Sequence, residues 1–204
     1  MLDDGLPLPR KSIQPAVQEV PKMKKLIAIA LTAFVASVAQ AEKPKFYAEA
    51  GYTFVNYEES FDGDIYKSSP KVVRLIGGVE LSKNLAIEAS IGFNGGSDSV
   101  SYNGYDLSDA QVKISSIYGF YIKPKVELAP NFELFGRLGY TNASATVSVV
   151  GYGSEEASDS DFSYGVGATY SIDPKVSINV DYMSYLNKTG YSAKGFSVGL
   201  GYKF

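Results

Sequence analysis

The sequence predicts an all-β fold, an eight-stranded antiparallel up-and-down transmembrane β-barrel. Three observations support this fold: a strictly alternating last segment, seven further alternating segments, and a separation of long from short connections. In residues 194–204 the polar face is mostly glycine and serine, whereas a soluble half-buried strand usually carries bulky solvated side chains there. The apolar face of this segment consists of Phe196, Val198, Leu200, Tyr202 and Phe204.

Alternation with a period of two residues identifies the other seven strands. In the second of them, Val72 and Ile76 are apolar exceptions on the polar face. Pro124 lies within the fourth and costs a ladder hydrogen bond, so a bulge or local break is expected there. An even number of strands of about ten residues suits a closed bacterial barrel, in which every backbone group is paired where no water can reach. The seven strands are expected at about 45–57, 71–81, 85–93, 111–128, 132–141, 162–171 and 176–183.

Short and long connections alternate along the chain. This pattern predicts that both termini and the tight turns face the periplasm, and that the long Gly/Ser/Asp-rich loops lie outside the cell. A soluble lipocalin-like barrel is the alternative, because it also has eight alternating strands, with its apolar face turned inward around a ligand. The tight turns are expected at 82–84, 129–131 and 173–175, and the long loops near 58–70, 94–110, 142–160 and 186–193.

Aromatic residues near the strand ends favour the membrane barrel over the lipocalin-like one, since interfacial belts form at such positions. Tryptophan is absent, so tyrosine and phenylalanine are expected to supply both girdles. The girdle residues are expected to be Tyr47, Tyr52, Phe54, Tyr140, Phe162, Tyr164, Tyr170, Tyr182, Tyr202 and Phe204.

The beginning of the chain predicts export. A basic start at Met23 precedes an apolar run over 26–39, and Ala39 and Ala41 provide the small residues of a cleavage site. The run is shorter than the roughly 20 residues that a membrane-spanning helix needs, so we expect a signal peptide over 23–41 rather than an anchor. Residues 1–22 are expected to be a non-native upstream extension, with translation starting at Met23, and the barrel domain is expected to occupy 42–204.

Composition excludes several classes of function. The formal net charge of -3 is too small to indicate a nucleic-acid partner. Cysteine is absent, which removes thiolate nucleophiles and thiolate metal sites. Histidine is absent as well, and it is the commonest metal ligand and the usual general base near neutral pH. We therefore expect no catalytic residues, no metal, no cofactor and no enzymatic activity.

Charged residues on the polar face would point into the barrel. An eight-stranded interior is only wide enough for its own side chains, so these charges are expected to pair with one another. Four of them lie at similar distances from the periplasmic strand ends, which makes Arg137 the expected centre of a carboxylate cluster. An ion path through the interior is the alternative. The expected interior network is Glu49, Arg74, Glu80, Glu88, Lys113, Lys123, Glu133, Arg137 and Asp181.

With these strands in place, residues 42–204 resemble the small eight-stranded outer-membrane barrels, which include the OmpA transmembrane domain, OmpX-like proteins and porin-family β-barrel domains. The closing residues 199–204 look like the terminal signal that such proteins present to the barrel-assembly machinery, with Tyr202 and Phe204 as its aromatic residues. The resemblance implies a monomer in the bacterial outer membrane, surrounded by lipid and lipopolysaccharide. It also implies that any extracellular ligand would bind through the loops.

Two functions remain open at this point. The first is a structural or surface-interaction protein that acts through its outer loops, and the second is a narrow pore for small polar solutes or ions. Lipid-modifying enzymes share the architecture, but the deacylases and palmitoyltransferases among them rely on a histidine, which this chain lacks. Acidic clusters near 58–64 and 155–161 are expected to be solvated parts of the outer loops.

Overall fold

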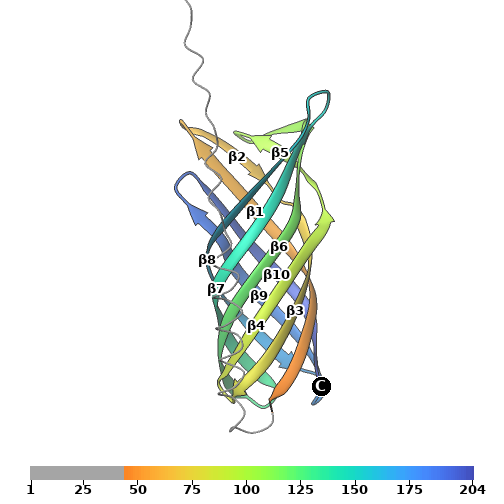
Figure 1. The fold of residues 1–204 in the computed structure, drawn as a ribbon, viewed down its shortest axis with the longest axis vertical. Helices are drawn as coiled ribbons and strands as arrows, with labels where there is room; N and C mark the ends of the chain where they lie inside the picture. Colours follow the sequence, from red (N-terminus) through yellow and green to blue (C-terminus); the bar gives the residue numbers. More distant parts are fainter. Residues whose placement is uncertain (1–43) are drawn as a thin grey trace, which may run out of the picture. The chain divides into compact units, whose positions relative to one another are not determined.

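The computed structural model describes residues 44–204, which form one antiparallel β-sheet. Eight long strands are paired in succession, and the last of them pairs with the first, so that they close into a ring (Figure 1). The predicted eight-stranded barrel is confirmed. Residues 44–204 contain no helix that is long and apolar enough to cross a membrane. The ring strands are β1 (Lys45–Phe61), β3 (Lys71–Ser82), β4 (Leu85–Gly96), β6 (Tyr105–Ala129), β7 (Phe132–Val149), β8 (Gly153–Ser171), β9 (Val176–Lys188) and β10 (Tyr191–Lys203).

The two ends of the ring differ. One end, here called the turn end, carries the tight turns at 83–84, 130–131 and 172–175 together with the C-terminus (Figure 1). The opposite end, here called the hairpin end, carries two additional short strands, β2 (Asp64–Ser68) and β5 (Asp98–Tyr102). There β2 pairs with β1, β5 pairs with β6, and the two short strands pair with each other. The ladder of the ring therefore continues beyond its eight long strands.

The expected long loops are mostly strands, which corrects the sequence prediction. β7 and β8 stay paired over their whole length, from Phe132↔Tyr170 to Val149↔Gly153, with a turn of three residues between them. On the outer face of β7 the apolar residues end at Tyr140 and polar residues follow, but the backbone pairing with β8 continues to Val149. Alternating hydrophobicity therefore locates the membrane-spanning part of a strand and misses its solvated extension.

Two hairpins at the hairpin end turn at an Asx-Gly pair, which the sequence shows directly. Asp62 and Asn103 have φ of 50° and 48°, and each is followed by a glycine with positive φ, at Gly63 and Gly104. Asn-Gly and Asp-Gly pairs favour the two-residue turns that match the twist of a hairpin. These pairs connect β1 to β2 and β5 to β6, so they predict the two strands that alternation missed.

The wall of the ring has an apolar outside and a mostly polar inside. Leu200, for example, is 59% exposed, whereas Ser197 and Thr53 are buried inside and hydrogen-bond each other at 2.9 Å. Inward glycines leave room for large side chains on the neighbouring strand. An ideal Cβ on Gly78 would lie 2.2 Å from Cζ of Tyr47, to which Gly78 is paired. The glycine-rich face therefore accommodates side chains that fill a narrow interior.

The interior has two parts along its length. Nearer the turn end it is charged, and nearer the hairpin end it is apolar. Val72 is one of the two exceptions noted in the sequence, and it belongs to this apolar part, while Ile76 is buried as well. The apolar cluster consists of Val55, Val72, Ile114, Ile117, Leu186 and Ala193, with Tyr57, Ala143, Ala145 and Tyr191 packed against it.

Two irregularities in strand β6 bear on the sequence prediction. At Pro124 the pairing with β7 is interrupted, but Ile122↔Leu138 and Lys125↔Phe135 keep the same register, so a local break occurs there without a bulge. A bulge occurs instead between Ile114 and Ser116. A bulge inserts one extra residue and reverses which face the following residues occupy. The expectation that Lys113 faces the interior is therefore wrong: Lys113 is exposed, and Val112 and Ile114 are buried.

Candidate functional site: the charged network inside the barrel

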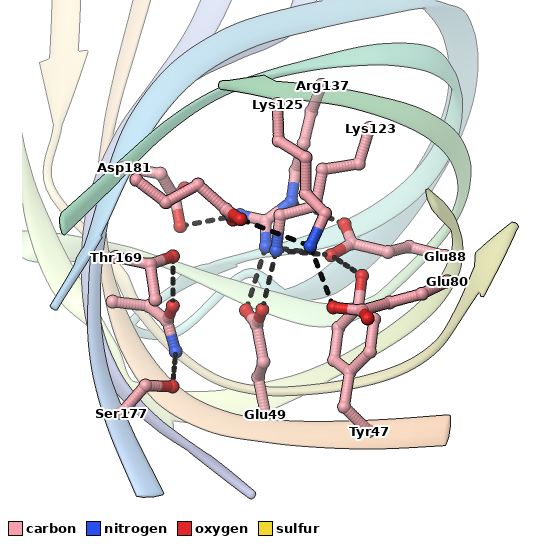
Figure 2. A network of polar contacts seen from close by, with 12 residues as sticks. Tyr47, Glu49, Glu80, Glu88, Lys123, Lys125, Arg137, Thr169, Ser177 and Asp181 are labelled. Atoms are coloured by element: carbon pink, nitrogen blue, oxygen red, sulfur yellow. Dashed lines mark hydrogen bonds and ion pairs between the residues drawn. The ribbon is translucent and has the colours of Figure 1, made fainter. Parts of the chain in front are cut away.

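Six charged side chains meet inside the half of the barrel that is nearer the turn end. Each comes from a different strand, and each occupies an inward position of the two-residue alternation. Figure 2 shows most of them converging on one guanidinium group. The six, here called the central network, are Glu49 (β1), Arg74 (β3), Glu88 (β4), Lys123 (β6), Arg137 (β7) and Asp181 (β9).

Arg137 is the centre of the central network and is 1% exposed. Its Nη2 lies 2.8 Å from Oε2 of Glu49, its Nε 2.5 Å from Oε2 of Glu88, and its Nη1 2.7 Å from Oδ2 of Asp181. A planar guanidinium presents donors in three directions, which a lysine ammonium cannot do in the same fixed geometry. One side chain thus connects strands β1, β4 and β9 to β7.

The other two cations complete the pairing. Lys123 Nζ lies 2.8 Å from Glu49 Oε1 and 2.9 Å from Glu88 Oε1. Arg74 donates to both carboxylate oxygens of Asp181 and, at 3.0 Å, to the hydroxyl of Tyr185. Three cations therefore face three carboxylates. Among the described residues, no buried side-chain nitrogen or oxygen lacks a hydrogen-bond partner.

Aromatic residues surround the central network, and sequence reasoning missed them. Tyr47 was expected in the membrane girdle, but it is buried inside and its hydroxyl donates to Oε1 of Glu88 at 2.7 Å. The Phe135 ring lies 4.3 Å from Lys123 Nζ and 4.6 Å from the guanidinium carbon of Arg137. Rings at these distances attract cations. The parity of Tyr47, two residues before Glu49, was the signal for its inward position.

A second ion-pair cluster lies at the turn end. Lys125 Nζ is 2.7 Å from Glu80 and 3.1 Å from Glu133, and Lys203 is 3.5 Å from Glu80. Glu80 and Glu133 were expected in a single interior network, whereas the structure places them in this separate cluster. Sequence reasoning missed Lys125, although it lies two residues after Lys123 and on the same face.

Two cavities are lined by the second cluster, and the smaller of them also touches the central network. A polar pocket of about 450 Å³ at the turn end is lined by Lys45, Lys83, Lys125 and Lys203 together with Glu80, Glu127 and Glu133. A much smaller cavity of about 40 Å³ lies between Glu49 and Lys123 on one side and Glu80 and Lys125 on the other. The space that touches the central network is therefore large enough for only roughly one or two water molecules.

The remaining residues expected from the sequence belong to the signal cleavage site near the N-terminus and to the assembly signal at the C-terminus. Tyr202 and Phe204 both face outward near the turn end, and their rings form an edge-to-face pair with centroids 5.4 Å apart. Ala39 and Ala41, expected at the signal cleavage site, lie outside the described residues, as do residues 1–22 and the rest of 23–41. Within 44–204 no group of three or more His, Cys, Asp or Glu residues could hold a metal ion.

The fold and the site together define a class of protein. A closed ring of antiparallel strands with an apolar outer wall and a paired, charged interior is a transmembrane β-barrel. The sequence agrees, because residues 26–204 match the family model of the outer membrane protein beta-barrel domain. The chain belongs to this family and is a protein of the bacterial outer membrane. A search of curated proteins finds no match.

Solved structures of small outer-membrane proteins have the same fold. Neisserial surface protein A matches with a TM-score of 0.58 and 17% identity, covering 80% of this chain and 100% of that one. Ail of Yersinia pestis matches with a TM-score of 0.56 and 20% identity, again covering 80% and 100%. The N-terminal barrel domain of Pseudomonas aeruginosa OprF matches with a TM-score of 0.54 and 11% identity, covering 79% and 100%. At these identities the likeness concerns the fold.

Proposed function

We propose that this protein is a non-enzymatic outer-membrane barrel that acts through its hairpin end, on the outside of the cell, and does not conduct solutes. The observation that carries the proposal is the filled interior. Three cations and three carboxylates occupy the cross-section near the turn end, and the apolar cluster around Val55 and Ile117 occupies it near the hairpin end. A barrel closed in this way offers its membrane wall and its outer strands for contact.

The alternative is a narrow pore, and one observation favours it. The pocket of about 450 Å³ at the turn end and the small cavity beside Glu49 and Lys123 are both lined by the second cluster, so polar space approaches the central network from one side. For an ion to move further, Lys123 or Arg137 would have to change its partners. The ion would then have to pass the apolar cluster, which supplies no polar partners for it.

Single-channel recording of the folded protein in a planar bilayer separates these functions. We expect no conductance steps, with a heat-modifiable band on a gel as evidence that the barrel has folded. Reproducible steps that are abolished by Arg137→Ala or Lys123→Ala would overturn the proposal and establish a pore. Lys175→Ala is the control, because Lys175 is exposed in the turn at 172–175, lies over the Tyr202 ring and lines neither cavity.

The proposal extends to how the protein reaches and occupies its membrane. Residues 23–41 act as a signal peptide cleaved after Ala41, residues 1–22 are not part of the native chain, and Tyr202 and Phe204 present the assembly signal. The mature protein is a monomer among lipid and lipopolysaccharide. The intact mass of protein purified from outer membranes tests the processing: a species that still contains Met1 would contradict it. Substituting Phe204 by Ala should lower the yield of folded barrel in cells.

A further inference from the structure

The hairpin end contains a row of four tyrosines and one glutamate, one from each of five strands. Tyr191 of β10 pairs with Glu59 of β1, and Glu59 pairs with Tyr66 of β2. Tyr66 in turn pairs with Tyr102 of β5, and Tyr102 with Tyr105 of β6. Directly paired residues of antiparallel strands project from the same face of a sheet. These five side chains, here called the tyrosine row, therefore lie side by side on one face.

The row faces the lumen side of the hairpin end and is partly open to solvent. Tyr191, at one end of the row, packs against the apolar cluster and has its ring centroid 6.4 Å from that of Tyr57. Tyr105, at the other end, is 76% exposed. The row therefore runs from the edge of the buried interior to the solvent.

Ring contact and neighbouring hydrogen bonds join β2 to β5 at the middle of the row. The rings of Tyr66 and Tyr102 have centroids 5.1 Å apart. Next to them, the backbone N–H of Asn103 donates to the carbonyl of Ile65 at 2.9 Å, and its side-chain amide donates to Asp64 at 3.0 Å. Side chains held in place before binding lose less conformational entropy when a partner arrives.

Carboxylates accompany the aromatic rings. Glu59 lies within the row and accepts a hydrogen bond from Tyr57 at 2.9 Å, and Asp159 accepts one from Tyr191. The carboxylate of Asp64 beside Tyr102 raises the pKa of that phenol, which keeps the hydroxyl neutral. Segments 58–68 and 98–109 together contain seven carboxylates and a single lysine, Lys67, which is paired with Glu58 at 3.0 Å. This part of the hairpin end is strongly acidic.

We infer that the tyrosine row is a binding surface for the cationic side chains of a basic polypeptide outside the cell. This inference rests on the proposed function, since it names the partner of the hairpin end. Aromatic faces attract guanidinium and ammonium groups, and neighbouring carboxylates add charge pairing and steer the approach. A second copy of the chain would bring acidic surface against acidic surface and is therefore disfavoured.

The acidic surroundings also distinguish this chain from one of its structural neighbours. Ail of Yersinia pestis was crystallised with the heparin analogue sucrose octasulfate, a polyanion. Like charges placed opposite each other at an interface oppose binding. The tyrosine row should therefore reject sucrose octasulfate and accept a chain of arginines.

The binding test uses the folded protein in nanodiscs of zwitterionic lipid. The fluorescence anisotropy of a labelled nona-arginine peptide is measured against a nona-glutamate peptide of the same length. We expect saturable binding of the arginine peptide, weakening as salt is raised, and no binding of the glutamate peptide. Sucrose octasulfate, tested by calorimetry, should not bind to the protein.

Variants distinguish the tyrosine row from general acidity. The double variant Tyr66→Leu/Tyr102→Leu keeps the apolar bulk and removes the phenol rings, and we expect it to weaken binding of nona-arginine about tenfold. Glu59→Gln keeps the shape of the side chain and should weaken binding about threefold with a flatter salt dependence. Tyr152→Leu is the matched control, because Tyr152 is 92% exposed at the β7–β8 turn and lies outside the row.

The inference would be overturned if nona-arginine does not bind, or if the double variant binds it as tightly as Tyr152→Leu does. Binding of sucrose octasulfate in calorimetry would also overturn it. A dimer that sedimentation detects and that Glu59→Gln abolishes would show that a second copy of the chain occupies the row. If the double variant fails to fold, as judged by heat-modifiable mobility, Glu59→Gln decides the matter alone. Loss of peptide binding together with a silent bilayer recording refutes only this inference, whereas conductance refutes the proposed function.

Discussion

Arg137 shows how a single residue organises the interior. Its three donor groups hold carboxylates from three other strands, and all three carboxylates are buried. Removing one partner from a buried ion-pair network is far more costly than the net contribution of the pair, because charge is left unpaired. The stability of the barrel should therefore depend strongly on this one side chain.

Arg137→Ala should destabilise the folded barrel by about 3 kcal/mol or more, since Glu49, Glu88 and Asp181 would lose a shared cation. Urea unfolding in lipid vesicles measures the change. Lys83→Ala is the control: Lys83 is 79% exposed and only 3.8 Å from its partner, so its removal should cost less than about 1 kcal/mol. Equal stability of the two variants would contradict a central role for Arg137.

Inward glycines are a second residue-scale feature. An ideal Cβ on Gly139 would lie 1.9 Å from the carbonyl oxygen of Phe120 and 2.7 Å from the Tyr121 ring, so the backbone would have to move. Gly139→Ala should cost about 1–3 kcal/mol of unfolding free energy in urea titrations. Gly77→Ala is the matched control, because nothing lies within 4 Å of its ideal Cβ. A tolerated Gly139→Ala would show that the wall relaxes more easily than its close packing indicates.

Much of the interior chemistry at the residue scale could be predicted. Inward parity located all six members of the central network, and similar depth along the strands indicated Arg137 as its centre. Parity failed for Lys113, because the bulge at Ser115 shifts the faces of β6 and the bulge depends on the pairing with β7. Parity also could not separate the central network from the second ion-pair cluster, because that separation depends on which strands are neighbours and how they are staggered.

The elements are joined at the turn end by turns with their own side-chain chemistry. Asp173 Oδ1 accepts the backbone N–H groups of Lys175 and Val176, at 2.7 and 2.8 Å. These hydrogen bonds lower the pKa of the Asp173 carboxyl from its ordinary value of 3.8. The ionised carboxylate therefore stabilises the folded turn above the ordinary pKa, and this stabilisation is lost as the pH falls through the lowered one.

Asp173→Ala should be less stable than the unmodified protein at pH 7, and the difference should shrink as the pH is lowered below the depressed pKa of Asp173. Urea unfolding at a series of pH values down to about 2 measures it. Asp173→Asn keeps an oxygen acceptor without the charge, so its stability relative to Asp173→Ala should not change with pH. A gap between Asp173→Ala and the unmodified protein that stays constant with pH would mean that the ionised carboxylate plays no part.

At the scale of the elements, the eight spanning strands could be predicted, and their solvated extensions could not. Outward Leu, Phe and Tyr residues mark the length of strand in contact with lipid. Beyond it, β7 and β8 carry serine and threonine on their outer face and hydrogen-bond across strands, as in Ser144 with Ser158 at 2.7 Å. Only the Asp62-Gly63 and Asn103-Gly104 pairs signalled that chain outside the membrane forms hairpins.

At the scale of the whole described part, residues 44–204 consist of a closed ring and, at its hairpin end, an extension of paired strands. Ring closure through β1 and β10 pairs backbone groups where lipid offers no partner. The β7–β8 extension makes no contact with the central network, so it should tolerate shortening. Removing the paired segments 146–149 and 153–156 also removes the partners of residues 110–113 in β6, so the urea midpoint of the barrel should fall, but only slightly. A large loss of stability would show that the extension supports the ring.

What the sequence determined by itself was the fold class, the number of spanning strands and the charges that face inward. These follow from the two-residue period of an extended chain, which covalent geometry imposes wherever a strand forms. The tertiary structure decided the partition of the charges, the outward position of Lys113 and the tyrosine row across β10, β1, β2, β5 and β6. Each depends on register between strands far apart in the chain, which is settled only when all the strands pair and the ring closes.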